Sequence, residues 1–371
     1  MNVNPYEFAG QEKICSPQLV FYPQLIEQNI AMMKETAAGA GRLWPHIKTH
    51  KMERVTKMLM EAGIRRFKCA TVAELEMAVR AGADAALLAY PLVGPNMERF
   101  LRICKDFPDT CVYAVGDDTE QVRKLGALGE RCQITVNLLM DIDMGQHRTG
   151  VAPERAEELY QEWSGFQGIR LCGFHCYDGH RHERSLAERQ AAAAPMDALI
   201  GKIRNHLISR GLDCSVVVMG GTPTFPCHIG FKDAFLSPGT CVIQDAGYRD
   251  AYPDLPFVPA AALLTRVVSR PSYDTFTLDL GTKAVASDPP VPRAEIVGME
   301  YARTVMHNEE HWVLKVPGDR VKEIPQIGSI LFALPVHICP TTALYPSVLA
   351  VRGGRIEGWW EVTAGKRKIT Y

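Results

Sequence analysis

Four basic side chains crowd the end of a short apolar run, where Arg42, Lys48, His50 and Lys51 lie within or beside the stretch W-P-H-I-K-T-H-K at residues 44–51. Pro45 fixes its own φ and disfavours a helical residue before it, so the run predicts a strand that ends at Lys48. A lysine at the mouth of a strand can be partly desolvated, and desolvation suits a lysine to Schiff-base chemistry. The alternative is a basic strand end that faces water.

Two later loops consist of small residues and threonines, Gly220-Gly221-Thr222-Pro223-Thr224 and Pro238-Gly239-Thr240. Small residues let backbone N–H groups approach an anion closely, and threonine hydroxyls add donors. The first loop follows the seventh predicted strand and the second lies within the eighth, and in a (β/α)₈ barrel the loops after strands seven and eight often bind phosphate. A pair of ordinary turns is the alternative interpretation.

Arg148 lies in a polar segment, 141–150, that follows another predicted strand. Because a guanidinium is always charged, it is a natural partner for a phenolate oxygen, although a surface ion pair would use the same residue.

Polar aromatic residues are concentrated where the sixth predicted strand ends, in the stretch G-F-H-C-Y-D-G-H-R-H at residues 173–182. Strand alternation places His175 and Tyr177 on one face, and His180 and His182 fall in the following loop. A loop histidine at this rim can take a proton from a substrate hydroxyl or help that hydroxyl to leave. Packing or solvation would also explain any one of these side chains.

A candidate metal pair occurs near the C-terminus, in the stretch P-V-H-I-C-P-T-T at residues 335–342. If this stretch is a strand, His337 and Cys339 point the same way and can reach one ion together. Two protein ligands leave positions open for water and substrate. Thiolate plus imidazole favours Zn²⁺ over Mn²⁺.

The segments that must position these residues alternate between short apolar strands and amphipathic helices. Eight strands are predicted, at 43–48, 66–70, 85–90, 111–115, 134–138, 171–177, 215–219 and 235–242. Helical patterns are predicted at 25–38, 71–81, 96–105, 119–128, 153–163 and 186–210. Such alternation favours βαβ units in a (β/α)₈ TIM-type barrel, with an open doubly wound sheet as the structural alternative.

The pattern changes after about residue 253, where prolines cluster and helical periodicity gives way to short β-rich runs. This predicts a second, mostly antiparallel β domain. We assign residues 19–253 to the barrel, and residues 1–18 and 254–371 to the β domain with the candidate metal pair.

Composition excludes several classes of function. The 41 Lys and Arg residues balance 42 Asp and Glu residues, which leaves no electrostatic footprint for nucleic acid. No apolar run approaches the length of a membrane span, and residues 1–10 lack the features of a secretory signal. The 11 cysteines contain no C-x-x-C pair and are expected to be reduced thiols in a cytoplasmic protein.

The motifs together resemble the D-threonine aldolase and D-serine dehydratase family, fold-type III pyridoxal-phosphate (PLP) enzymes with an alanine racemase-like N-terminal domain. The stretch at 44–51 resembles its "R-P-H-x-K-T-H-K" signature, with Trp44 in place of Arg, which is expected to alter a wall of the site. The segment at 141–150 resembles "D-x-G-x-x-R-T-G", with Asp143 replacing a Gly. Residues 335–342 resemble "H-x-[CD]-P-T", and residues 308–311 and 279–283 resemble the family's "E-E-H" and "D-x-G-x-K" segments.

The resemblance assigns roles to particular residues. It makes Lys48 the lysine that holds PLP, and Arg148 and Tyr177 contacts of the cofactor. It assigns one of His180 and His182 as the catalytic base, without deciding between them. The phosphate role falls on Gly221, Thr222, Gly239 and Thr240, and the divalent metal, Zn²⁺ or Mn²⁺, falls on His337 and Cys339.

The implied activity is a PLP- and metal-dependent lyase that cleaves β-hydroxy-D-amino acids to glycine and an aldehyde, like D-threonine aldolase. A D-serine dehydratase, which would give pyruvate and ammonia, is the main alternative. An amino-acid racemase and a non-catalytic PLP-binding protein are further alternatives. The resemblance also implies a homodimer that acts on a small D-amino acid.

Overall fold

The computed structural model describes residues 4–371 and divides the chain into two compact units. The barrel unit comprises Met33–Lys48, Val55–Gly239 and Lys366–Tyr371. The β unit comprises Met1–Met32, Thr49–Arg54 and Thr240–Gly365. Residues 1–3, which the sequence assigns to the β domain, lie outside the described residues.

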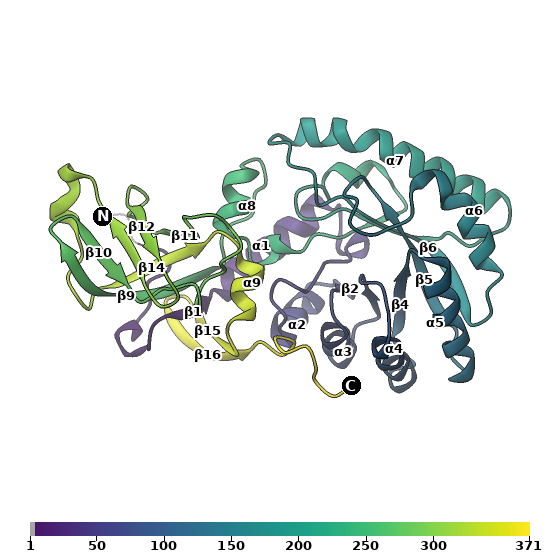
Figure 1. Ribbon diagram of the computed structural model, residues 1–371, viewed down its shortest axis with the longest axis horizontal. Coiled ribbons are helices and arrows are strands. Elements are labelled where there is room, and N and C mark those ends of the chain that lie inside the picture. The colour runs from purple at the N-terminus through teal and green to yellow at the C-terminus, as the bar shows by residue number, and fades with distance from the viewer. Residues whose placement is uncertain (1–3) are drawn as a thin grey trace. The chain divides into compact units, whose positions relative to one another are not determined.

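Seven parallel strands form the sheet of the barrel unit and follow one another in sequence order (Figure 1). They are β2 (Arg66–Cys69), β3 (Ala85–Leu88), β4 (Cys111–Gly116), β5 (Val136–Asp143), β6 (Ile169–Tyr177), β7 (Val216–Met219) and β8 (Ala234–Leu236). The helices that alternate with them are α2 (Glu53–Glu61), α3 (Val72–Arg80), α4 (Pro95–Asp106), α5 (Thr119–Arg131), α6 (Pro153–Ser164) and α7 (Leu186–Ser209). This order of short strands and helices confirms the predicted barrel class.

Helix starts in this unit carry side-chain caps that the sequence encodes. Thr71 accepts a hydrogen bond from the backbone N–H of Glu74 and begins α3. Asp118 begins α5 in the same way, and Ser185 forms a reciprocal capping box with Glu188 at the start of α7. Each cap satisfies a backbone donor that a helix leaves unpaired at its N-terminus.

The first predicted strand, 43–48, is not a regular strand, but it occupies the place of one. The N–H groups of Trp44 and His46 donate to the carbonyls of Leu236 and Pro238, at 2.8 and 2.7 Å. On the other side, Ile47 donates to the Lys68 carbonyl at 2.9 Å, and Lys68 donates to the Pro45 carbonyl at 2.8 Å. Because Pro45 has no N–H, the ladder is interrupted there. The segment therefore bridges β8 and β2 through a few hydrogen bonds only.

The β unit contains a nine-stranded sheet that is antiparallel apart from one parallel pair, β1 with β15. Its strands are β1 (Gln18–Phe21), β9 (Ala261–Ser272), β10 (Thr275–Leu278), β11 (Ala294–Ile296), β12 (Arg303–His307), β13 (Trp312–Lys315), β14 (Ile330–Pro335), β15 (Ser347–Arg352) and β16 (Arg355–Glu361). Three helices belong wholly or largely to this unit, namely α1 (Pro23–Thr36), α8 (Ala246–Ala251) and α9 (Ile338–Ala343). The sheet confirms the predicted antiparallel β domain.

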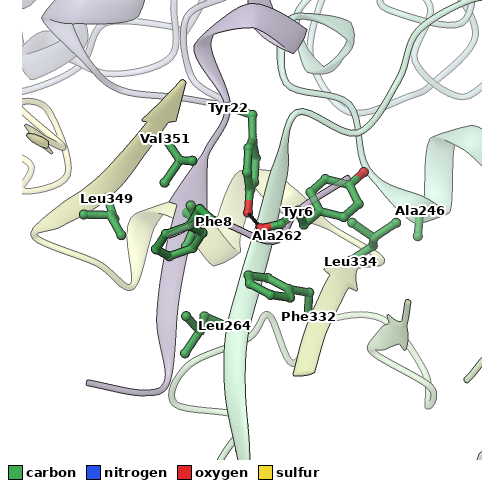
Figure 2. Packing of buried hydrophobic residues seen from close by; sticks show 11 residues of the cluster. Tyr6, Phe8, Tyr22, Ala246, Ala262, Leu264, Phe332, Leu334, Leu349 and Val351 are labelled. Carbon is green, nitrogen blue, oxygen red and sulfur yellow. Dashed lines mark hydrogen bonds between the residues drawn. The ribbon is translucent and has the colours of Figure 1, made fainter. Parts of the chain in front are cut away.

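Aromatic side chains from distant segments pack together in the core of the β unit (Figure 2). The Tyr22 hydroxyl donates a hydrogen bond to the Tyr6 carbonyl at 2.6 Å, and the Tyr6 hydroxyl donates to the Pro259 carbonyl at 3.0 Å. Phe8 meets Phe332 edge to face. These contacts attach the N-terminal segment to Tyr22 beside β1, to Pro259 before β9 and to Phe332 on β14. Both buried hydroxyls have an acceptor.

The boundary between the two units differs from the predicted one at residue 253. It falls between Gly239 and Thr240, and the last six residues, Lys366–Tyr371, join the barrel unit. Arg99 Nε donates to the Tyr371 carbonyl at 3.0 Å, and the Thr370 N–H donates to Glu76, which explains the placement of the C-terminal segment. Composition does not reveal such contacts because they join residues far apart in sequence.

No helix within residues 4–371 has the length and apolar character needed to cross a membrane.

Candidate active site

Lys48 lies at the end of the segment that bridges β8 and β2, and its side chain is partly buried. Its N–H lies 3.3 Å from His46 Nδ1, and the His46 N–H is held by Pro238. The carboxyl ends of parallel strands are where barrel enzymes bind their substrates. The position of Lys48 therefore agrees with the predicted cofactor lysine, whose role remains a prediction.

A second lysine, Lys68, lies on the neighbouring strand β2 and is only 2% exposed. Its Nζ lies 5.3 Å from the ring centroid of Tyr177. Burial, together with the charge of Lys48, lowers the pKa of Lys68 to about 7. Sequence reasoning missed this residue. The available signal was a lysine between two apolar residues, Phe67 and Cys69, in a four-residue strand.

Arg148 and Tyr177 are brought together, because the Arg148 guanidinium carbon lies 5.1 Å from the Tyr177 ring centroid. Asp143 Oδ1 accepts hydrogen bonds from the N–H groups of Gly145 and His147, at 2.9 and 3.0 Å, and so shapes the loop that carries Arg148. Gly145 has a φ of 105°, which favours glycine. The motif D-x-G-x-x-R-T-G therefore starts at Asp143 itself, which corrects the expectation that Asp143 replaces a glycine.

The two glycine loops meet each other at the carboxyl ends of β7 and β8. The Gly239 N–H donates to Thr222 Oγ1 at 3.1 Å, and the Gly221 N–H donates to Thr224 Oγ1 at 3.0 Å. A Cβ added at Gly239 would lie 3.0 Å from His46 Cβ, a tight contact that glycine avoids. Gly221 lies against Tyr177, where an added Cβ would be 3.1 Å from Cε2. The predicted phosphate residues Gly221, Thr222 and Gly239 are thus neighbours of Tyr177 and of the Lys48 segment.

A buried charged network underlies the first glycine loop. His228 is fully buried between two carboxylates, with Nε2 3.0 Å from Asp178 and Nδ1 2.9 Å from Asp197. Thr224 Oγ1 donates to the other oxygen of Asp178 at 2.5 Å. Burial opposes the protonated imidazole, but the hydrogen bonds to Asp178 and Asp197 outweigh it and raise the pKa of His228 to about 9. Sequence reasoning missed this network because its members lie on three separate segments.

Arg189 on α7 holds the same loop from another side. It is fully buried, and its Nε donates to the Pro223 carbonyl at 2.9 Å while its Nη1 donates to the carbonyls of Glu183 and Arg184. The loop is therefore fixed by two buried cations before any ligand arrives.

The histidines at the end of β6 differ in their surroundings. His175 is buried, with Nδ1 2.7 Å from Asp141 Oδ1, and its Nε2 has no hydrogen-bond partner among the described residues. His180 is partly buried beside Gly145, where an added Cβ would lie 3.3 Å from His180 Nε2. Burial and the neighbouring Arg181 lower the pKa of His180. His182 is exposed. Of the two predicted bases, His180 is the one shown to lie against the loop that carries Arg148.

The candidate metal pair does not lie on a strand, contrary to the prediction. His337 precedes α9 with extended backbone, and Cys339 lies in the first turn of that helix. The two side chains are nevertheless within hydrogen-bond reach of each other. His337 Nδ1 lies 2.5 Å from Asp288 Oδ2, an arrangement that orients an imidazole ligand. Among the described residues, no group of three or more His, Cys, Asp or Glu side chains could hold a metal ion.

The Cys339 thiol is flanked by two hydroxyls of the β unit. Its Sγ lies 3.1 Å from Thr49 Oγ1 and 3.6 Å from Thr240 Oγ1. Thr240, predicted to bind phosphate, thus contacts the candidate metal ligand in this structure.

Two further motif segments, 279–283 and 308–311, pack on each other. Lys283 Nζ lies 2.8 Å from Glu309 and 3.4 Å from Glu310, and these charges are exposed. Asp279 accepts hydrogen bonds from Thr265 Oγ1 and the Arg266 N–H, which gives it a structural place in the sheet.

Trp44 belongs to the apolar core rather than to a wall of the site. It is 1% exposed and packs with Leu87, Leu139 and Val218, with edge contacts to Tyr113 and Phe235. The expectation that it alters a wall of the site is therefore wrong.

Comparison with known proteins gives two domain matches and several relatives that span nearly the whole chain. The model of the alanine racemase N-terminal domain matches residues 23–245, and the model of a putative serine dehydratase domain matches residues 260–351. A D-threonine aldolase from an Arthrobacter species is 27% identical, over 95% of this chain and 93% of the relative.

Solved structures show the same architecture. The crystal structure of D-threonine aldolase from Filomicrobium marinum gives a TM-score of 0.87 at 28% identity, and covers 95% of this chain and 96% of that one. The structure of D-threo-3-hydroxyaspartate dehydratase from Delftia sp. HT23 gives a TM-score of 0.82 at 23% identity. The match covers 95% of this chain and 98% of that one. These matches confirm the resemblance that the motifs indicate. The chain therefore belongs to the family of the alanine racemase N-terminal domain, and it continues into a C-terminal domain of the serine dehydratase type.

Proposed function

We propose that this protein is a PLP- and divalent-metal-dependent lyase that cleaves β-hydroxy-D-amino acids to glycine and an aldehyde, as the names of its aldolase relatives suggest. One observation carries the proposal. The barrel unit gathers a strand-end lysine, an Arg–Tyr pair and two glycine loops, and we call this group (Lys48, Arg148, Tyr177, Gly220–Thr224 and Pro238–Gly239) the barrel mouth. The relatives give the reaction class, and this group gives the residues that would perform it.

The barrel mouth fits PLP in its donor set and its shape. A Cβ added at Gly221 or Gly239 would contact Tyr177 or His46 tightly, and such glycines are expected where a phosphate loop approaches its ligand closely. His175 Nε2 is a buried polar atom without a partner among the described residues. When bound, PLP would supply an electron sink for the bond broken at the substrate's Cα.

With PLP bound, the residues of the barrel mouth would have separate roles. Lys48 would hold the cofactor and, when free, exchange a proton at the substrate's Cα. Arg148 would bind a phenolate oxygen with a charge that does not titrate, and Tyr177 would support that guanidinium through its ring. Thr222 and Gly239 would lie at the phosphate.

We assign the base to His180 rather than His182. A base must reach the hydroxyl whose proton it removes, and His180 lies against the Arg148 loop whereas His182 is exposed. Burial lowers the pKa of His180, which keeps the imidazole neutral and able to accept a proton at neutral pH.

His337 and Cys339 would hold a divalent metal, with Asp288 orienting the imidazole. One thiolate and one imidazole suit Zn²⁺, and Mn²⁺ is the alternative ion. A variant of the related D-threo-3-hydroxyaspartate dehydratase has been solved in a metal-free form, which supports a metal in that relative. When bound, the metal would act as a Lewis acid that lowers the pKa of the substrate's β-hydroxyl.

A D-serine-type dehydratase is the second candidate. The match of residues 260–351 to a serine dehydratase domain favours it, because that domain contains the candidate metal pair. In this case Lys48 would remove the α-proton and hydroxide would leave, giving a keto acid and ammonia. The resemblance also implies a homodimer.

The deciding experiment incubates the protein and PLP with D-threonine and with D-serine, in Zn²⁺, Mn²⁺ or EDTA. Metal-dependent formation of glycine and acetaldehyde from D-threonine is the expected result. Metal-dependent pyruvate from D-serine would replace the aldolase assignment with the dehydratase. Racemised substrate in EDTA would contradict both, as would PLP that is bound while every substrate remains intact.

A further inference from the structure

We propose that Lys68 is an additional anion-binding residue of the barrel site, which binds an anionic oxygen of the molecule held there, either the cofactor's phenolate or the substrate's carboxylate. This inference rests on the proposed function and extends it to a residue that neither the motifs nor the comparisons assign.

The backbone of Lys68 is fixed at the barrel closure. Its N–H donates to the Pro45 carbonyl, and its carbonyl accepts from the Ile47 N–H, one residue before Lys48. The side chain is 2% exposed, and its Nζ lies over the Tyr177 ring. Lys68 on β2 and Arg148 in the loop after β5 therefore extend toward the same tyrosine ring.

Within residues 4–371, no hydrogen bond joins the Lys68 ammonium to an acceptor. Its Nζ contacts the Tyr177 ring, and a ring face replaces only part of the hydration that an ammonium loses on burial. Buried charges in proteins are normally paired, so an unpaired one in a cleft points to a missing partner.

The nearby carboxylates are already engaged by other donors. Asp141 accepts from Thr149 Oγ1 at 2.8 Å and pairs with His175. Asp178 pairs with His228 and accepts from Thr224. Two cations, Lys48 and Arg148, act on Lys68, and the two engaged carboxylates, Asp141 and Asp178, act on it with the opposite sign. The surroundings of Lys68 thus hold more positive charge than free carboxylate, which is the electrostatic setting for an anionic ligand.

A structural role alone would predict something different. A lysine that serves only to pack would bury its methylene stem and direct its ammonium to water. The nearly complete burial of Lys68 argues against that arrangement. Its lowered pKa, near 7, agrees with an amine that gains its charge fully when an anion binds beside it.

The test compares Lys68→Met, which removes the charge but keeps the length, with Lys68→Arg, which keeps the charge. Arg66→Met is the matched control, because Arg66 lies two residues earlier on the same strand and stacks on Phe235 outside the barrel mouth. Thermal melts first establish that each variant is folded.

The first measurement needs no turnover. PLP is titrated into each apoprotein, its absorbance is followed against pH, and borohydride reduction with mass spectrometry locates the cofactor on Lys48. If the anion is the cofactor phenolate, Lys68→Met weakens PLP binding about tenfold or more and moves the pH midpoint of the absorbance, whereas Lys68→Arg restores much of both.

The second measurement is steady-state kinetics. If the anion is the substrate carboxylate, the resting spectrum and PLP affinity of Lys68→Met match wild type, and KM rises about tenfold or more with a smaller change in kcat. Lys68→Met with unchanged PLP affinity, spectrum and KM would overturn the proposal. Failure of the proposed function would give a different result, because PLP would be bound to Lys48 but no lyase products would form. The spectral comparison of the variants would still test the role of Lys68. A wild-type protein that bound no PLP would overturn both.

Discussion

The barrel mouth and the His337–Cys339 pair are both candidate ligand sites, but their surroundings differ. Beneath the barrel mouth, fully buried His228 and Arg189 hold the first glycine loop through several hydrogen bonds. The His337–Cys339 pair is partly buried, and Asp288, Thr49 and Thr240 are its neighbours within the β unit. The barrel mouth is therefore preorganised by buried hydrogen bonds, whereas the His337–Cys339 pair supplies only two candidate metal ligands.

The difference follows from what each site would have to bind. A phosphate needs several donors in fixed directions, and buried networks hold such donors without reorganisation. A catalytic metal needs open positions for water and substrate, so two protein ligands and one orienting carboxylate are sufficient. Changes in the barrel mouth are therefore expected to alter cofactor binding, and changes at the metal pair are expected to alter turnover alone.

The largest effect is expected for Lys48→Ala. Removing the amine removes both the cofactor attachment and a proton-transfer group, so product formation should fall by at least about 10³-fold. The absorbance of lysine-bound PLP should disappear, which a spectrum of the purified variant measures. Lys51→Ala, three residues away in the same stretch, is the control. Retention of the wild-type PLP spectrum by Lys48→Ala would contradict the cofactor assignment.

A strong effect confined to turnover is expected for Cys339→Ser and His337→Ala. Both should reduce activity to the level of EDTA-treated wild type, on the order of 10²-fold or more, while PLP binding stays unchanged. Asp288→Asn should cost about tenfold to 100-fold because it only orients the imidazole. Metal content measured by mass spectrometry gives an independent readout. Loss of PLP binding in these variants would remove the distinction between the two sites.

The two loop histidines give a smaller, paired comparison within the barrel unit. His180→Gln should lower kcat about 100-fold, since it removes a positioned base, and His182→Gln should stay close to wild type. The pH profile of kcat should lose its acidic limb in His180→Gln only. Equal losses in the two variants, or a loss in His182→Gln alone, would show that the base has been assigned to the wrong residue.

The smallest effect concerns stability and its dependence on pH. The pKa of His228 is raised to about 9, above its ordinary value, so its contribution is fully present below about pH 6.5 and is lost as pH rises through 9. The free energy of unfolding, from urea melts, should fall across this window by at most on the order of 3 kcal/mol. His228→Gln should flatten that dependence and weaken PLP binding through the loosened loop. An unchanged slope would mean that His228 is not charged in the fold.

The sequence predicted the candidate site residues correctly as neighbours where they lie within a few positions of each other in the chain. Tyr177 and His180 are three residues apart at the end of one strand, and the glycine loops follow β7 and β8 as expected. The candidate metal pair was predicted from its spacing and the family resemblance, and the strand predicted for it is wrong. Pro340 in the first turn of α9 was the signal for a helix start, because proline is tolerated there.

Periodicity and turn chemistry act over a few residues, so the amino-acid order alone predicts the barrel class, the β domain and the candidate residues of the local motifs. The tertiary structure alone decided that Trp44 is core, that His228 lies between Asp178 and Asp197, and that Lys68 is buried over Tyr177. These facts depend on partners that are 30 to more than 100 residues distant. Burial and charge pairing are properties of the folded neighbourhood, which no short stretch of sequence contains.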